Sequence, residues 1–372
     1  MITCKKVMRI IEEFAPKGLA AEWDNVGLQV GNPEGEVKSI LVTLDVTEEV
    51  LDEAVSLGAN MIVSHHPLIF KSLKNLRYDS PTGWLVAKAV QSNIHIYAAH
   101  TNADNTIEGV NQCLARRIGL KNTQVLKRES SKLYKVVVYV PEGFENTVRT
   151  AMGDAGAGRL GDYSYCSFMT SGTGSFKPLE GANPFIGKQG RLEEVPEYRI
   201  ETVVPEAILH STISKMLQVH PYEEPAYDVF LLENQDARYG LGRIGELEEP
   251  LELGCLAEKI KEDLDCPWVL VSGDLEAVIK RAALCGGAGA DLIYLAKSRN
   301  ADVLVTGDVK YHEAMTAKEL GLSIIDAGHN ATERVFIPEL AEYLRKKLNK
   351  QGEEIDVYTS TIDTNPWTQV IG

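Results

Sequence analysis

The stretch "KSILVTLDVTEEVLDEAVSLGANMIVSHHP", Lys38 to Pro67, contains the pattern from which the fold of the outer parts of the chain can be predicted. Two short apolar runs flank a segment whose apolar residues recur at helical spacing and which opens with Thr47 and two glutamates. A threonine followed by acidic residues is a typical helix start, so the stretch predicts strand, helix, strand. Two strands joined by a helix lie parallel in a covered sheet.

The same alternation continues with the helical "SPTGWLVAKAVQSN" and the apolar "HIYAAHTNAD", and it resumes near the C-terminus with "AVIKRAALCGG", "ADVLVTGD" and "LSIIDAGHN". We therefore expect an α/β core with mainly parallel sheets, in which the two outer parts of the chain share one sheet. The N-terminal "MITCKKVMRIIEEFAPKG" has charges at helical spacing, which predicts an amphipathic helix of the fold and not a secretion signal.

A different pattern interrupts this core. After the polar "KRESSK", the expected elements follow the order β-α-β-β-α-β, from "LYKVVVYVP" to "AYDVFLLEN". This is the order of a ferredoxin-like module, whose neighbouring ends allow it to sit inside another domain. We expect this insertion domain at about residues 131–234, between core parts at 1–130 and 235–372.

Composition narrows the class of protein. The 372 residues carry a net charge of −15 without a Lys/Arg-rich run, so nucleic acid is not expected as a partner. No segment approaches the roughly 18 uninterrupted apolar residues of a membrane helix. The six cysteines are dispersed and form no Cys-x-x-Cys pair, which favours a reducing cytoplasm.

Metal-ligand residue types follow the expected strands of the core. Open α/β sheets bind ligands at the carboxyl ends of their strands. At or just after these ends lie His65, His66, His100, Asn102, Asp104, Asp308, Asp326, His329 and Glu333. This convergence predicts a metal site more strongly than any single motif does.

The adjacent histidines His65 and His66 can be either a hydrogen-bonded structural pair or metal ligands. Pro67 favours extended backbone at His66, and successive extended residues point to opposite sides. One ion would not readily take both imidazoles, whereas two ions about 3.5 to 4 Å apart could. His329 and Glu333 are four residues apart at an expected helix start, so they can lie on one helix face.

We therefore expect two divalent transition-metal ions per chain. His65, His66 and His329 are the expected terminal ligands, with Asp104 and Glu333 as candidate bridges. Nitrogen and oxygen ligands without thiolate suit zinc, iron or manganese. Five side chains do not fill the coordination of two ions, and the positions left for water or substrate are typical of a catalytic site. The candidates for supporting or acid roles around the metals are His100, Asp308 and His312.

An ordered set of motifs accompanies these residues: "EWDNVGLQVG", "SHHP", "AAHTNAD", "GLGRIG", "CGGAG", "TGDVKYH" and "GHNATE". Through them the chain resembles the Nif-three-like family, known as GTP cyclohydrolase I type 2 homologues. The resemblance implies a dinuclear site on the same five ligands and a homohexameric toroid around a cavity. Within the insertion, "VHPYEEPAYDVFLL" is similar to the CutA and PII-like group, which implies trimeric contacts.

These observations predict a cytoplasmic, metal-dependent hydrolase-like protein with a small-molecule substrate. Water acidified by the metals would attack carbon or phosphorus in a nucleotide-like or phosphoester substrate. The alternative is a non-enzymatic metal-binding regulatory protein whose PII-like insertion senses a small molecule or gates the metal site.

Overall fold

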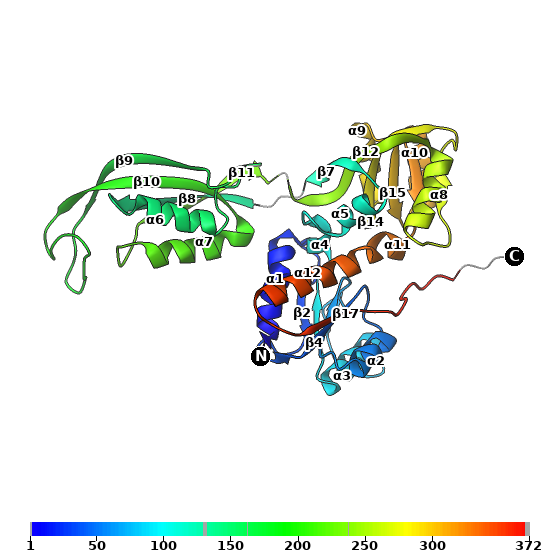
Figure 1. Cartoon of the computed structure of the whole chain (residues 1–372), viewed down its shortest axis with the longest axis horizontal. Coiled ribbons are helices and arrows are strands. Elements are labelled where there is room, and N and C mark those ends of the chain that lie inside the picture. The colour runs from blue at the N-terminus through cyan, green and yellow to red at the C-terminus, as the bar shows by residue number, and fades with distance from the viewer. Residues whose placement is uncertain (1, 129–131, 162, 237, 369–372) are drawn as a thin grey trace. The chain divides into compact units, whose positions relative to one another are not determined.

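The computed structural model describes residues 2–128, 132–161, 163–236 and 238–368. Two compact units are present, one made of Met1–Glu129 with Ala237–Gly372 and the other of Ser130–Asp236 (Figure 1). The domain boundary expected near Ser131 lies outside the described residues. Among those residues, no helix combines the length and the apolar character needed to cross a bilayer.

The first unit contains a five-stranded sheet of order β17-β4-β5-β6-β2. Its strands are β17 (Asp356–Thr359), β4 (Ser39–Thr43), β5 (Met61–Ser64), β6 (His95–Ala98) and β2 (Gly27–Val30). All neighbours are parallel except β2, which runs antiparallel to β6. The predicted helix between β4 and β5 is present as α2 (Glu48–Ser56), and the Thr47 hydroxyl accepts a hydrogen bond from the Val50 N–H at 3.3 Å.

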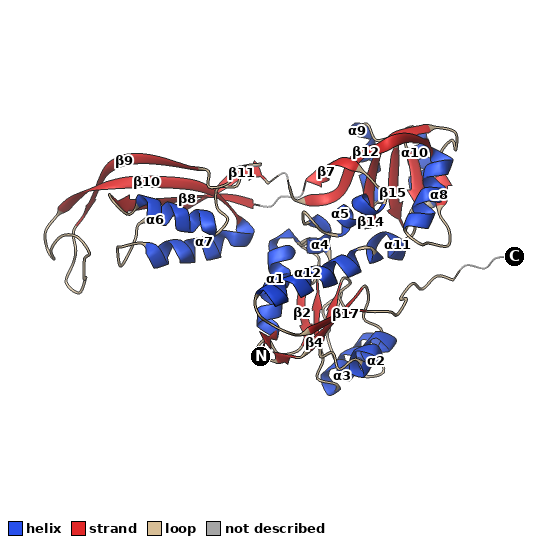
Figure 2. Ribbon diagram, in the orientation of Figure 1, coloured by secondary structure: helices blue, strands red, loops and turns tan. Residues whose placement is uncertain are grey.

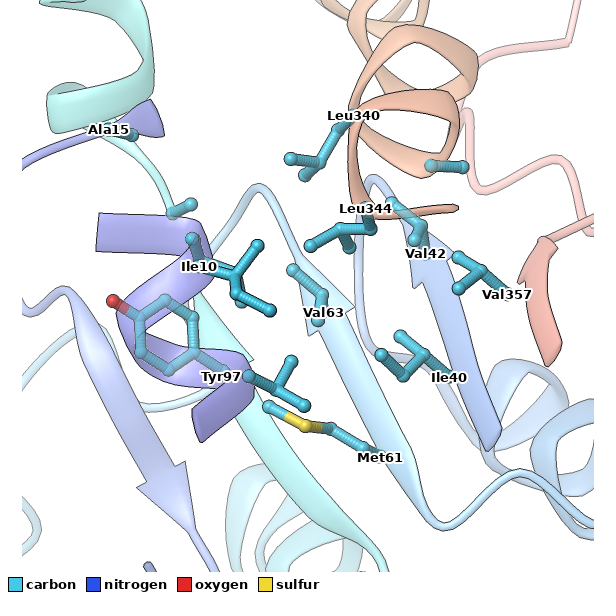
Figure 3. Close-up of a cluster of buried hydrophobic side chains, with 14 of the residues drawn as sticks. Ile10, Ala15, Ile40, Val42, Met61, Val63, Tyr97, Leu340, Leu344 and Val357 are labelled. Carbon is cyan, nitrogen blue, oxygen red and sulfur yellow. The ribbon is translucent and has the colours of Figure 1, made fainter. Parts of the chain in front are cut away.

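Helices cover both faces of this sheet. The amphipathic α1 (Cys4–Phe14) and the C-terminal α12 (Phe336–Lys350) pack on one face, where Figure 3 shows Ile10, Leu340 and Leu344 against Val63. On the other face, α2 and α3 (Pro81–Gln91) pack against Leu41 and Ile62. Because both faces are buried, the strands are almost continuously apolar.

A second sheet of the same unit has the order β13-β16-β15-β14-β12-β7. Its strands are β13 (Leu270–Ser272), β16 (Ser323–Asp326), β15 (Val303–Gly307), β14 (Val278–Ala288), β12 (Gly240–Glu252) and β7 (Lys121–Arg128). Helices α5 (Val110–Arg117) and α8 (Leu253–Asp263) contribute to the apolar cluster on one face, and α9 (Ile293–Ser298) and α10 (Tyr311–Glu319) to that on the other.

Two expectations about the core were wrong. The core has two sheets and not one, and each sheet contains strands from both outer parts of the chain, because β17 joins the first sheet and β7 joins the second. The second sheet is also mixed, because only β14, β15 and β16 are mutually parallel. The chain leaves the unit after β7 and returns at β12, which pairs beside it with Gly240 opposite Arg128, and neighbours connected in this way run antiparallel.

The second unit follows the predicted element order (Figure 2). Its elements are β8 (Lys132–Pro141), α6 (Glu145–Asp154), β9 (Ser167–Phe176), β10 (Glu193–Pro205), α7 (Glu206–Val219) and β11 (Tyr227–Gln235). The strands form an antiparallel sheet of order β11-β8-β10-β9. Helices α6 and α7 pack on the face that carries Val136, Val138 and Ile200.

Candidate metal centre

His65 and His66 directly follow β5 and continue its pairing with the strand beside it. The backbone N–H of His65 donates to the Thr43 carbonyl at 3.1 Å, and that of His66 donates to the Leu44 carbonyl at 2.9 Å. The two rings lie 5.0 Å apart between centroids. The sheet therefore holds both imidazoles at its carboxyl edge, where loops of the same unit converge on them.

Four imidazoles of this region are oriented in the same way, each with Nδ1 bonded to an oxygen of the protein. The pairs are His65 with the Ala99 carbonyl at 2.9 Å, His66 with Asp45 at 2.8 Å, His100 with Asp24 at 2.9 Å and His329 with Asp308 at 2.7 Å. A carbonyl or carboxylate oxygen only accepts hydrogen bonds, so Nδ1 carries the proton in each case. In the neutral ring, Nε2 is then left as the metal-binding atom.

The Nε2 atoms of three of these histidines approach one carboxylate. Glu333 Oε2 lies 3.0 Å from Nε2 of His66 and 3.1 Å from Nε2 of His329, although neither contact has hydrogen-bond geometry. Glu333 Oε1 lies 3.7 Å from Nε2 of His65, which is also 3.7 Å from Asp104 Oδ1. All five predicted ligands thus lie together, brought from the residues just after β5, from α4 (Thr101–Asn105) and from α11 (His329–Arg334).

Burial leaves polar atoms of this cluster without partners. His65 Nε2, Asp104 Oδ1 and Glu333 Oε2 are buried and have no hydrogen-bond partner, and the exposed fractions of these residues are 0%, 8% and 3%. Burial of two carboxylates beside several imidazoles is costly unless a cation or a proton compensates them. The donor set and its unpartnered atoms therefore fit divalent metal ions.

The electrostatics of the metal-free cluster agree with this fit. Burial would raise the pKa of Glu333, but the imidazoles of His65, His329 and His66 hold it well below its usual range. Burial raises the pKa of Asp104. Burial would lower the pKa of His66, yet the carboxylates of Asp45 and Glu333 raise it to about 10. Without a metal, protons on His66 and His329, whose pKa values the neighbouring carboxylates raise, supply positive charge beside the buried carboxylates.

A glycine gives Glu333 its space. Gly287 has φ +63°, and a Cβ placed there would lie 2.3 Å from Glu333 Oε1. The "CGGAG" motif thus lets the backbone pass beside the carboxylate, and only glycine combines this conformation with the close approach. A phosphate-binding role for the motif is not needed to explain its glycines.

The supporting candidates occupy different places. His100 lies 5.2 Å from His65 and 5.4 Å from His66 between ring centroids, so it faces the cluster. Asp308 reaches the cluster by its hydrogen bond to His329. His312 is exposed and contacts Tyr311 edge to face with 5.2 Å between ring centroids, and none of its described contacts is with a proposed ligand. Asp326 accepts hydrogen bonds from the backbone of Val309 and Gly328.

Sequence reasoning missed two carboxylates and an aromatic pair. Asp45 and Asp24 hold Nδ1 of His66 and His100. Asp45 lies just after a strand, the same signal that singled out His65, and Asp24 lies within the quoted "EWDNVGLQVG". Trp23 and Phe70 are 64% and 48% exposed, and their rings lie 5.7 Å apart with planes tilted by 54°, at 6.1 Å and 6.4 Å from the ring of His100.

Comparison with known proteins assigns the chain that carries this cluster to a protein family. A family model described as Duf34/NIF3 (NGG1p interacting factor 3) matches residues 2–366. The chain belongs to this family. It is 45% identical over 363 residues to the GTP cyclohydrolase 1 type 2 homolog of Halalkalibacterium halodurans, covering 97% of each chain. It is 43% identical over 365 residues to that of Bacillus subtilis, covering 98% of each.

The fold agrees with this assignment to the Duf34/NIF3 family. The structure is similar to that of a Bacillus cereus protein related to NIF3, with a TM-score of 0.90 and 43% identity over 99% of each chain. A Staphylococcus aureus protein, SA1388, is similar with a TM-score of 0.77 and 33% identity, again over 99% of each chain. The mixed α/β fold is therefore that of NIF3 proteins.

Proposed function

We propose that this protein is a dinuclear metal-dependent hydrolase-like enzyme with His65, His66, Asp104, His329 and Glu333 as metal ligands. The observation that carries the proposal is the division of Nε2 atoms between the two oxygens of Glu333. His66 and His329 approach Oε2, whereas Nε2 of His65 lies 3.7 Å from Oε1 and 3.7 Å from Asp104 Oδ1. A carboxylate with ligands gathered at both of its oxygens is suited to bridge two ions.

The donor set suits zinc, iron or manganese, and the bound metals would lower the pKa of water and polarise the substrate. The residue of this chain best placed to move a proton is His100. Its Nδ1 is bonded to Asp24, and one of its ring nitrogens lies within 4.8 Å of nitrogens of His65 and His66. Burial would raise the pKa of Asp24, but hydrogen bonds from His100 and Thr101 lower it to about 2, so Asp24 remains a carboxylate that orients the imidazole.

The exposed rings of Trp23 and Phe70 support a planar substrate. Both rings stand beside His100, and an aromatic pair of this kind can hold a nucleobase by stacking. The proposed reaction is therefore hydrolysis of a nucleotide-like or phosphoester substrate. The names of the relatives, GTP cyclohydrolase 1 type 2 homologs, agree with a purine nucleotide.

We propose that the second unit is the predicted insertion domain at about residues 131–234, with a ferredoxin-like fold similar to that of the CutA and PII-like group. The β-α-β-β-α-β order and the antiparallel β11-β8-β10-β9 sheet support this assignment. The proposed assembly is a homohexamer with trimeric contacts through this unit.

The alternative function, metal-dependent regulation without catalysis, is favoured by the separate pocket of the second unit described below.

The deciding experiment measures metal content and turnover together. Protein reloaded with zinc, iron or manganese should hold about two ions per chain and hydrolyse at least one member of a panel of nucleotides and phosphoesters. Glu333→Gln keeps the side-chain volume and should reduce turnover at least about a hundredfold, because it removes the charge shared by the ions. Glu319→Gln, an exposed carboxylate on α10, is the matched control. Full metal content without any turnover would favour the regulatory alternative.

A further inference from the structure

The second unit holds a pocket of about 720 Å³ that the proposed metal chemistry does not use. Its floor is the sheet face opposite α6 and α7, because side chains alternate along a strand and Val138 and Ile200 face the helices. Tyr139, Glu197 and Arg199 therefore lie on the pocket side. The chain after β9 and the segment around Tyr222 form its walls.

The pocket contains a buried carboxylate without a cation. Glu197 is 9% exposed, and its Oε1 accepts a hydrogen bond from the Tyr222 hydroxyl at 2.9 Å. Within the described parts of the chain, no lysine, arginine or histidine forms an ion pair with it. Burial of an uncompensated charge is unfavourable, so a cationic group beside Glu197 would be stabilised.

The basic side chains near Glu197 do not compensate its charge, because each has another partner, is exposed or is neutral. Arg199 is paired with Glu201 at 3.1 Å, and Lys177 is exposed. His220 accepts a hydrogen bond from the Tyr222 N–H at Nδ1 and donates from Nε2 to the Tyr139 carbonyl, so its ring is neutral. Among the described residues of this unit, none therefore supplies the positive charge that Glu197 lacks.

Aromatic rings gather beside the carboxylate. The ring of Tyr222 lies 5.8 Å from that of Phe176 and 6.4 Å from that of Phe185, and all three line the pocket. Ring faces attract ammonium groups, and a set of rings beside one acid is typical of sites for organic cations. A hard metal ion would instead require several oxygen ligands.

Two glycines shape the floor. A Cβ at Gly174 would lie 2.1 Å from Glu197 Oε2, so glycine is what allows the carboxylate to lie across β9. Gly172 pairs with Glu197 across the strands, and a Cβ there would meet no atom within 4 Å. The pocket floor is therefore open beside the acid, with room for a ligand.

We propose that this pocket binds a small organic cation, an arylalkyl-ammonium compound, with its nitrogen beside Glu197 and its apolar body among Phe176, Phe185 and Tyr222. The proposal is independent of the chemistry of the metal centre. It gives the second unit a ligand-binding role of its own.

The test is calorimetric titration of the full-length protein with phenethylamine, benzyltrimethylammonium and the neutral 2-phenylethanol. The two cations should bind about tenfold or more tightly than the alcohol, because only they pair with Glu197. Glu197→Gln keeps the volume and should abolish that preference. Glu194→Gln removes an exposed carboxylate of the same strand outside the pocket and should preserve it.

A second variant does not depend on charge. Gly172→Val should fill the open floor and weaken binding of both cations about tenfold, and thermal unfolding of each variant verifies its fold. Equal affinities for the cations and the alcohol, or no binding at millimolar concentrations, would overturn the proposal. A further result would also overturn it: the parent protein binds no amine, and Glu197→Gln changes the molecular mass measured by sedimentation. In that case a second copy of the chain, and not a ligand, would compensate the carboxylate.

Discussion

At the scale of single residues, the proposed metal centre depends on which nitrogen atom of each imidazole is free. Asp45 and Asp308 hold Nδ1 of His66 and His329, and the Ala99 carbonyl holds that of His65. The oriented Nε2 atoms then approach different oxygens of Glu333. Individual substitutions should therefore act on individual ions.

His65→Ala and His66→Ala should each reduce the metal content from about two ions to about one, and the ion lost should differ between them. Elemental analysis gives the number, and anomalous scattering from crystals gives the position. His312→Ala, which removes an exposed histidine, should retain both ions. Loss of the same ion in both ligand variants would contradict the proposed division around Glu333.

The raised pKa values predict how the metal-free protein responds to pH. Contacts with Asp45 and Glu333 outweigh the burial of His66 and raise its pKa to about 10, and Glu333 raises that of His329 to about 9. Histidine in an unfolded chain has a pKa of about 6.5. These groups therefore contribute stability that is complete below about pH 6.5 and is lost as the pH rises through about 9 to 10.

Urea unfolding of chelator-treated protein should thus show a lower free energy of unfolding at pH 10 than at pH 6.5. His66→Ala should flatten this dependence, because it removes the group with the larger shift. In the metal-loaded protein the imidazoles are neutral ligands, so metal affinity should rise over the same pH range. A metal-free protein that gained stability toward pH 10 would show that the imidazoles are not protonated in the folded state.

At the scale of elements, the proposed metal centre requires a close approach between β14 and α11. Gly287→Ala adds a Cβ 2.3 Å from Glu333 Oε1 at a backbone φ of +63°. It should displace the carboxylate and cost metal binding as well as stability. Gly58→Ala is the matched control, because it has φ +67° and no atom within 4 Å of the added Cβ.

Both alanines should destabilise by about 1–2 kcal/mol from backbone strain. Only Gly287→Ala should also lower the metal content, which elemental analysis and thermal unfolding measure side by side. Full metal content in Gly287→Ala would mean that Glu333 adapts to the added Cβ or is not required as a ligand.

At the scale of the whole molecule, the chain leaves the first unit after β7 and re-enters it at β12 with Gly240 opposite Arg128. Replacing about residues 131–234 by a short Gly/Ser linker should therefore leave a folded first unit that still binds about two metals per chain, because all proposed ligands lie outside the removed segment. Circular dichroism, thermal unfolding and metal analysis test this. If the removed unit limits access to the proposed metal site, a chelator should strip metal from the shortened protein faster than from the parent. An unfolded shortened protein would show that the removed segment is part of the core.

The sequence by itself determined the α/β class, the alternation of many strands and helices in the core, and the residue types of the candidate centre, but not the strands β2, β13 and β17. Helix periodicity, the start at Thr47 and the position of His65 after an apolar run are local signals, readable without knowing what lies nearby in space. The family motifs pointed to the same five proposed ligands. The β-α-β-β-α-β order of the second unit was likewise a local pattern.

Only the tertiary structure decided what depends on contacts between distant segments. Strand pairing across the sequence separated the core into two sheets and made the second one mixed, because register and partner choice follow from packing and not from periodicity. The bond between His66 and Asp45, the clearance at Gly287 and the buried charge of Glu197 are likewise long-range. A carboxylate's chemistry depends on burial and on the charges that surround it, and the folded chain alone sets both.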